Sequence, residues 1–341
     1  MAEHPSAGDV HVNMPLTNIS VAYIQDASVF IADQAFPNIP VMKQSDRYYV
    51  YSRADFNRDE MKERAPGTES AGGGYDLDNT PTYFAPVNAY HKDVSDQVRS
   101  NADSPLNMDR DATIFVTQKA LIRRERTFAA RLDAANWAHS KTGVGVNPQT
   151  NEFLQWNDAN STPIENIRDA KTLVLESTGF EPNRLVLAKR VYDALVDHPD
   201  IVDRVKYGQT PGAPATVNAN ALAQLFEVER VLVSRAVYNA GGKGSSYSSS
   251  ASKEDSSFIM GPDAVLIYTT PTPGLLVPSA GYTFSWNGFM GASAFGSRIK
   301  RFRMEHLESD RIEVQMAYDQ KVVASDLGYV FADAVAVPTA S

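Results

Sequence analysis

The chain has 341 residues, of which 43% are hydrophobic and 21% charged, and these fractions are those of a folded protein, not a disordered tail. Its net charge of -9 disfavours a protein whose main task is to grip nucleic-acid phosphates, so any contact with DNA is expected to be indirect or weakly repulsive. No cysteine is present, which excludes disulfide frameworks and thiolate metal sites and indicates synthesis in a reducing cytosol. The length predicts one large domain or two interleaved ones.

The first forty or so residues are predicted to form an arm. Their apolar side chains, among them Val21, Ile24, Phe30 and Ile31, show no clear closure into a domain. The segment also lacks the basic start and apolar run of a signal peptide. We therefore interpret it as an arm that reaches for a partner.

Charges of both signs crowd the segment from Lys43 to Arg64, which cannot be buried alone and is therefore solvated or paired with a neighbouring chain. Tyr48 to Tyr51 and Thr82 to Tyr90 are strand-like runs on either side of the glycine break at 72–74. Together they predict a protruding hairpin with a long charged tip. The candidate contact residues on it are Arg53, Arg58, Glu60, Glu63 and Arg64.

A helix is predicted after Pro105. Its apolar residues recur at spacings of seven, seven and four, at Ile114, Leu121, Phe128 and Leu132, while the charges at 123–126 are expected to point elsewhere. If it continued from 112 to 139 it would be about 40 Å long at roughly 1.5 Å per residue. Such a rod is longer than most globular helices, although an ordinary amphipathic helix inside a core remains an alternative.

The middle of the chain predicts an α+β region, with a helix from Pro163 that ends at Gly179, a buried strand from Arg184 to Ala188, and another helix from Lys189. Strands and a helix continue to about residue 268, interrupted by a Gly- and Ser-rich loop at 241–253. Near the C-terminus, residues 299–307 and 311–318 predict a long antiparallel hairpin, because Ile312, Val314, Met316 and Tyr318 alternate with polar residues.

The stretch from Ala264 to Ser297 contains no charged side chain, which raises the question of a membrane span. Its three prolines, at positions 271, 273 and 278, exclude a continuous apolar helix. We expect buried strands and loops there, and no membrane contact.

A search for catalytic, cofactor and metal sites finds no convincing pattern, so we expect neither an enzyme nor a bound cofactor or metal. No two of the six histidines have the i, i+4 spacing of a zinc pair. Asp197, His198 and Asp200 are typical of a capped turn between helices more than of an acid–base cluster. The glycines at 143–145 and 242–244 lack the further residues of a phosphate-binding loop.

The order of these segments over almost the whole chain resembles the HK97-like major capsid proteins of tailed phages. No single string is diagnostic; the resemblance lies in their order. The stretches that carry it are 36–41 (FPNIPV), 46–51 (DRYYVY), 101–105 (NADSP), 112–113 (AT), 121–125 (LIRRE), 198–201 (HPDI), 206–208 (KYG), 284–286 (FSW) and 319–334.

The resemblance implies an α+β architecture in four parts. An N-terminal arm would occupy residues 1–45 and an extended loop, the E-loop, residues 46–99. A peripheral domain with a long spine helix and the hairpin would occupy 100–162 and 296–320. An axial domain would occupy 163–295 and 321–341.

The resemblance also implies the function. Subunits would group as hexamers and pentamers of an icosahedral phage head, assembled in the host cytoplasm, that encloses double-stranded DNA touched weakly and non-specifically. Further partners would be the portal, scaffold and decoration proteins of the virion. Two alternatives remain, an encapsulin that encloses a cargo enzyme and a soluble enzyme with an unrecognised site.

Three finer expectations follow. No long charged helical prefix precedes the arm, so we expect no large maturation cleavage. The family's crosslinked members join a lysine to an asparagine, and the hairpin at 298–318 contains no asparagine, so we expect no covalent crosslinks. We expect the Gly- and Ser-rich loop at 241–253 to lie near the symmetry axis of each capsomer.

Overall fold

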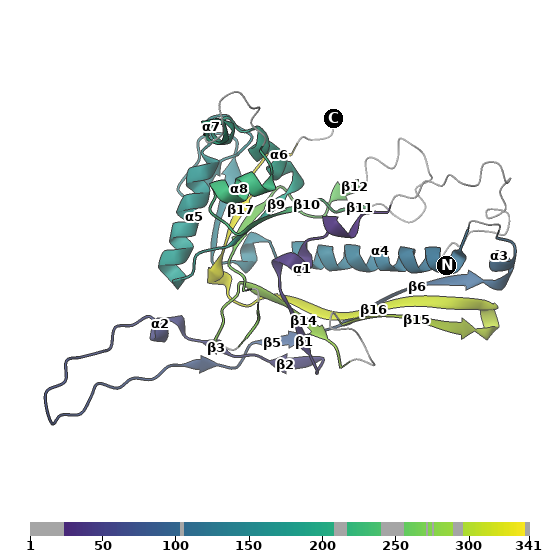
Figure 1. Cartoon of the computed structure of the whole chain (residues 1–341), viewed down its shortest axis with the longest axis horizontal. Helices are drawn as coiled ribbons and strands as arrows, with labels where there is room; N and C mark the ends of the chain where they lie inside the picture. Colours follow the sequence, from purple (N-terminus) through teal and green to yellow (C-terminus); the bar gives the residue numbers. More distant parts are fainter. Residues whose placement is uncertain are drawn as a thin grey trace.

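The computed structural model describes residues 24–102, 106–207, 217–239, 256–270, 272–274, 276–288 and 296–337. Two sheets organise the fold, one beneath a long helix and one among shorter helices, and a thin hairpin projects from the body (Figure 1). None of the described helices is both long and apolar enough to cross a membrane. The mixture of helices and sheets confirms the expected α+β class.

The long C-terminal strand β16 is the centre of the first sheet. Over its first part it pairs with β15 on one side and β6 on the other, and its last part pairs with β14, to which β1 adds in parallel. The predicted hairpin is thus confirmed, with its turn at residues 305–308. The strands are β1 (Asn38–Val41), β6 (Val87–Ser95), β14 (Gly281–Trp286), β15 (Ser297–Met304) and β16 (Ser309–Val322).

The spine helix α4 (Met108–Ala129) lies along this sheet, and Asn107 caps its start by accepting a hydrogen bond from the Arg110 N–H. The helix ends ten residues before 139, so it is about 33 Å long at roughly 1.5 Å per residue. The expected extension to 139 was wrong because Trp137 folds back. Its indole Nε1 donates to the Arg131 carbonyl at 3.0 Å, which satisfies an orphan acceptor just beyond the helix end.

The buried stripe of α4 differs from the predicted one. Ala112, Val116 and Ala120, spaced four apart, pack against Ile312, Val314 and Met316 of β16. Phe128 and Leu132 are buried as expected, whereas Ile114 is 37% exposed. Small side chains at the contact let the helix approach the sheet closely, which a pattern based on large apolar residues does not reveal.

The second sheet has six strands in the order β10-β9-β13-β17-β7-β8, and its strands β9, β13 and β17 lie in the largest hydrophobic core. The predicted strand at 184–188 is its β9, and β13 is buried along its whole length, as the uncharged stretch suggested. The strands are β7 (His139–Val144), β8 (Glu152–Leu154), β9 (Arg184–Ala188), β10 (Arg230–Ser234), β13 (Ala264–Ile267) and β17 (Gly328–Ala332).

Four helices lie around this sheet (Figure 1). The first, α5, ends where predicted, at Gly179 with φ +79°, a left-handed conformation that glycine adopts without strain. His198, between the second and third, is 3% exposed and bonds Ser161 Oγ at 3.1 Å, which confirms a structural turn. The helices are α5 (Pro163–Thr178), α6 (Lys189–Asp197), α7 (Pro199–Tyr207) and α8 (Ala219–Leu225).

The projecting hairpin is held by two short antiparallel ladders, β2 with β5 and β3 with β4. The predicted second strand, 82–90, is broken at Ala85 and Pro86, because proline has no N–H to donate. Beyond this break, β6 joins the main sheet. The hairpin elements are β2 (Ser45–Arg47), β3 (Val50–Tyr51), α2 (Arg53–Phe56), β4 (Leu77–Asp78) and β5 (Thr82–Phe84).

Short elements complete the chain. They are the 3-10 turns at Ala27–Val29, Ala134–Asn136, Glu305–Leu307 and Ser325–Leu327, with α1 (Ala32–Ala35), α3 (Asp96–Ser100), β11 (Val237–Asn239) and β12 (Ser256–Phe258). The loop at 241–253, for which an axial position was expected, lies outside the described residues, as do residues 1–23 of the arm.

Candidate assembly surfaces

The described part of the arm is fastened to the spine helix by a buried carboxylate. Oε2 of Glu125 accepts hydrogen bonds from the backbone N–H groups of Ile31 and Ala32, each at 3.0 Å, and Ser234 of β10 lies 3.4 Å from its other oxygen. Glu125 therefore joins arm, spine helix and second sheet. Burial raises its pKa to about 7, because an apolar environment disfavours the charged form more than these hydrogen bonds favour it.

Neighbouring contacts strengthen this attachment. Arg124 forms an ion pair with Asp33 of α1 and lies over the ring of Tyr318 at 5.2 Å. Further toward the N-terminus, the side-chain amide of Gln25 both donates to and accepts from the Val237 backbone of β11. The expectation that the charges at 123–126 all point away was wrong for Arg124 and Glu125, because the arm supplies polar partners that let them be buried.

The arm residue Phe36 enters the core. It is fully buried, and its ring meets Phe128 edge to face at a centroid distance of 5.1 Å. Ile31 is 3% exposed, whereas Ile24 is 54% exposed. The arm from residue 31 onward thus closes on its own chain, which corrects the expectation of an unclosed segment, and apolar exposure increases toward residue 24.

The five candidate contact residues all lie on the projecting hairpin, and four of them bond within the chain. Arg58 pairs with Asp55 and, at 3.3 Å, with Glu60, while Arg64 donates to the Thr68 carbonyl. Arg53 reaches from α2 to Asp326 on the body. Glu63 is exposed at the tip. The tip residues are thus brought together, whereas Arg53 belongs to the base.

The hairpin also exposes apolar area. Tyr51, Phe56 and Tyr75 form a ring cluster with centroids 5.6 to 6.0 Å apart, yet Phe56 and Tyr75 remain 56% and 61% exposed. Met61 is 92% exposed. Exposed aromatic area of this kind is a candidate contact surface.

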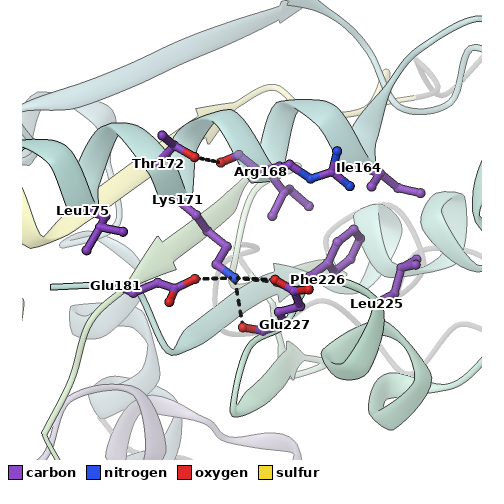
Figure 2. Close-up of a pocket in the computed structure, with 10 residues that line it drawn as sticks. Ile164, Arg168, Lys171, Thr172, Leu175, Glu181, Leu225, Phe226 and Glu227 are labelled. Atoms are coloured by element: carbon purple, nitrogen blue, oxygen red, sulfur yellow. Dashed lines mark hydrogen bonds and ion pairs between the residues drawn. The ribbon is translucent and has the colours of Figure 1, made fainter.

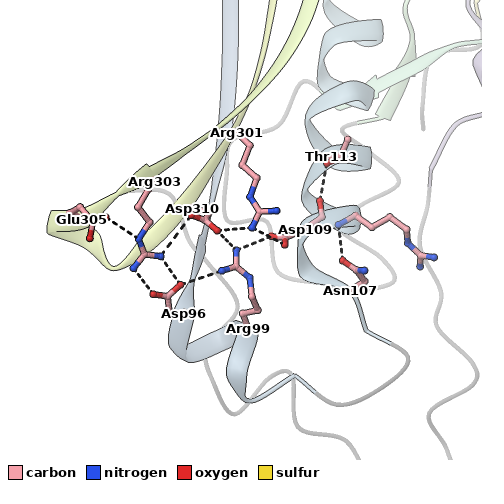
Figure 3. A network of polar contacts seen from close by, with 10 residues as sticks. Asp96, Arg99, Asn107, Asp109, Thr113, Arg301, Arg303, Glu305 and Asp310 are labelled. Carbon is pink, nitrogen blue, oxygen red and sulfur yellow. Dashed lines mark hydrogen bonds and ion pairs between the residues drawn. The ribbon is translucent and has the colours of Figure 1, made fainter.

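The far end of the β15–β16 hairpin is locked by a network of charges (Figure 3). Arg99 of α3 reaches Asp109 of α4 and Asp310 of β16, each at 2.9 Å, while Arg303 of β15 grips Asp96 with both terminal nitrogens. Charge-assisted bonds to Arg303 lower the pKa of Asp96, and those to Arg301 lower the pKa of Asp310. The network ties the first turns of α3 and α4 to the end of the β15–β16 hairpin.

A small cavity of about 180 Å³ lies between α5 and the turn after α8 (Figure 2). Lys171 projects into it, is 6% exposed, and donates to the carbonyls of Phe226 and Glu227 at 3.0 and 2.9 Å and to Glu181 at 2.8 Å. With three oxygen partners its ammonium is satisfied, so the arrangement is a structural tie. Among the described residues no His, Asp or Glu cluster could hold a metal ion.

Comparison with known proteins shows which proteins this chain is similar to. Residues 149–275 match the model of the phage major capsid protein E family. The major capsid protein of Pseudomonas phage JBD67 is 28% identical over 95% of this chain and 97% of its own. That of Burkholderia phage BcepMu is 22% identical over 94% of this chain and 95% of its own. The chain is a phage major capsid protein.

Solved structures show that this capsid protein has the HK97-like fold. A phage-related protein from Bordetella bronchiseptica aligns with a TM-score of 0.66 at 22% identity, covering 91% of this chain and 94% of its own. The mature capsid of bacteriophage PhiM1 gives 0.59 at 14%, covering 95% and 92%. An encapsulin complex from Synechococcus elongatus gives 0.55 at 12%, covering 96% of each. Fold alone therefore does not separate the two kinds of shell; the curated relatives do.

The capsid protein is a structural component of the phage head and not an enzyme. Sequence reasoning found its segment order but missed Arg124, Glu125 and Lys171 as buried anchors. A signal was present for the first, because Arg124 lies four residues before the buried Phe128 and continues the stripe of Val116 and Ala120. Lys171 likewise lies four residues after the buried Ile167, so it continues the buried face of α5.

Proposed function

We propose that this capsid protein assembles into the hexamers and pentamers of an icosahedral head that encloses double-stranded DNA. The observation that carries the proposal is the projecting hairpin. It extends from the body, bears charges of both signs at its tip, and exposes aromatic rings that its own chain leaves uncovered. Closed rings require one surface patch to meet a different patch on the next subunit, and a projecting arm of this kind supplies such a head-to-tail contact.

Within the proposal, residues 46–99 act as the E-loop and residues 1–45 as the arm. The peripheral domain comprises 100–162 and 296–320, and the axial domain 163–295 and 321–341. The contact to the neighbouring subunit is made by Arg53, Arg58, Glu60, Glu63 and Arg64. Portal, scaffold and decoration proteins are the further partners, the DNA is touched weakly and non-specifically, and assembly takes place in the host cytoplasm.

Neutralising the hairpin arginines tests the contact. The variant Arg53→Gln/Arg58→Gln/Arg64→Gln should slow or abort shell formation, leave the subunit folded, and show altered dependence on salt, because charge complementarity governs such encounters. Negative-stain microscopy counts particles and circular dichroism checks folding. Arg190→Gln/Lys206→Gln/Arg230→Gln, which removes three exposed cations outside the hairpin, is the matched control. Normal particle yield from the hairpin variant would refute a role for these charges.

The encapsulin alternative rests on the fold shared with a cellular shell protein. It predicts particles filled with a protein cargo, whereas the phage head predicts particles filled with DNA. Purified particles from infected or lysogenic cells, treated with nuclease and then opened, should release protected double-stranded DNA. Release of a co-purified enzyme without DNA would favour the encapsulin.

A further inference from the structure

Several cations of the described residues form ion pairs with carboxylates. Arg311 of β16 grips Asp93 of β6 through two bonds of 2.7 and 2.8 Å, and Arg99, Arg301 and Arg303 share the acidic cluster at the hairpin tip. A cluster of neighbouring cations without such partners is of interest, because like charges side by side on a helix repel one another.

One such group lies on the spine helix. Between residues 112 and 131 the sequence holds five cationic side chains and a single anionic one, Glu125, which is buried beneath the arm. Lys119, Arg123 and Arg126 are exposed and spaced by four and three residues, so they share one face of α4. Within the part of the chain that the structure describes, none of the three forms an ion pair with a carboxylate.

Aromatic rings accompany these cations. The ammonium of Lys119 lies 5.4 Å from the ring centre of Phe115, and Lys92 of β6 approaches the same ring at 5.6 Å. Arg126 lies over Tyr238 at 4.6 Å. Stacking on rings holds long basic side chains in place without neutralising them, so the positive charge remains available to a ligand. We call Lys92, Lys119, Arg123 and Arg126 the basic stripe.

We propose that the basic stripe binds the phosphate backbone of the packaged DNA, so that this face of the spine helix lines the inside of the shell. The inference rests on the proposed function, because a genome-filled head brings a polyanion against its inner surface. A row of separate cations without a deep pocket or base-reading amides fits a sequence-independent phosphate contact. The net charge of -9 alone predicts weak repulsion between the protein and DNA. The basic stripe would instead provide one local site of attraction on this acidic protein.

Lysine labelling of whole particles tests the location. Genome-filled heads and heads emptied of DNA are treated with a small acetylating reagent, and modification is quantified by mass spectrometry. Lys119 should be several-fold less reactive in filled heads than in emptied ones, while Lys62, on the exposed hairpin tip, should react equally in both. Equal reactivity of Lys119 in both would overturn the inference while intact particles still supported the proposed function.

Binding of a random 30-base-pair duplex to the unassembled full-length protein gives an independent measure. Lys119→Gln/Arg123→Gln/Arg126→Gln should reduce the slope of log Kobs against log [KCl] by about 3, since each phosphate contact contributes about 0.9. Arg190→Gln/Lys206→Gln/Arg230→Gln, which removes three exposed cations elsewhere, should leave the slope unchanged. An equal loss of salt slope in both triple variants would mean that only the overall charge matters, and it would refute a role for the basic stripe. DNA binding by the stripe variant equal to that of the wild type would refute it too. If the Lys119→Gln/Arg123→Gln/Arg126→Gln variant lost binding to an acidic peptide but still bound DNA like the wild type, the stripe would be assigned to an assembly partner. That result would also overturn the inference.

Discussion

Glu125 of the spine helix and Ile31 of the arm are 94 residues apart in the chain, yet the carboxylate of the first accepts the backbone N–H of the second at 3.0 Å. The bond is buried, and Ala32 donates to the same oxygen. One ionisable side chain therefore fixes the point at which the arm meets the body. Its burial also makes the attachment dependent on pH.

The pH dependence should be visible in the stability of the unassembled subunit. Because burial raises the Glu125 pKa from 4.5 to about 7, its contribution is fully present below pH 4.5 and is lost as the pH rises through 7. The full loss amounts to about 3 kcal/mol at 1.36 kcal/mol per pKa unit. Glu125→Gln keeps the shape without the charge and should lose no stability by this route. Urea unfolding at intervals from pH 5 to pH 8 compares the two, and parallel curves would contradict the prediction.

Gly281 should be intolerant of a side chain. A Cβ at this position would lie 2.5 Å from the Phe36 ring, which is itself fully buried against Phe128. Gly281→Ala should therefore displace the Phe36 ring, and the arm with it, from the core. We expect the subunit to lose about 1 to 3 kcal/mol of stability, as overpacked cores do. Gly145→Ala, whose Cβ would have no neighbour closer than 3.9 Å, is the control in thermal unfolding. Equal melting temperatures for the two variants would show that the arm tolerates the displacement.

Lys171 should be essential to the stability of the second sheet and its helices. Lys171→Met retains the apolar stem but leaves the carbonyls of Phe226 and Glu227 without their buried donor. The expected cost is on the order of 2 to 4 kcal/mol, since hydrogen bonds to charged groups are among the stronger ones. Lys189→Met, which breaks a partly exposed pair with Asp193 and a ring contact with Tyr192, should cost less than about 1 kcal/mol. Guanidinium unfolding compares the two variants, and similar midpoints would refute the stabilising role of Lys171.

Mature particles should lack covalent links between subunits. Lys62 and Lys92 are lysines of the segment from 46 to 99, but residues 298–318 offer no asparagine as a partner, and Lys92 lies over the Phe115 ring. Boiling particles in detergent should release monomers of 37.4 kDa on a gel. A ladder of higher oligomers would contradict this expectation.

The sequence by itself determined the features that depend on neighbours in the chain. The helix from Pro163 stops at Gly179 because only a residue at ease with positive φ continues there, and the alternation from Ile312 to Tyr318 allows only a strand with one buried face. The charges between 43 and 64 required an exposed hairpin. The order of such segments was enough to indicate the capsid family.

Tertiary structure decided what depends on distant partners. Arg124 and Glu125 look like solvent-facing charges in the sequence, and they are buried because Asp33 and the N–H groups of the arm meet them there. The spine helix ends at Ala129 instead of reaching 139 because Trp137 folds back onto the Arg131 carbonyl. A buried charge is stable only with a partner, and the partner's position is set by the packing of the whole chain, which local spacing does not encode.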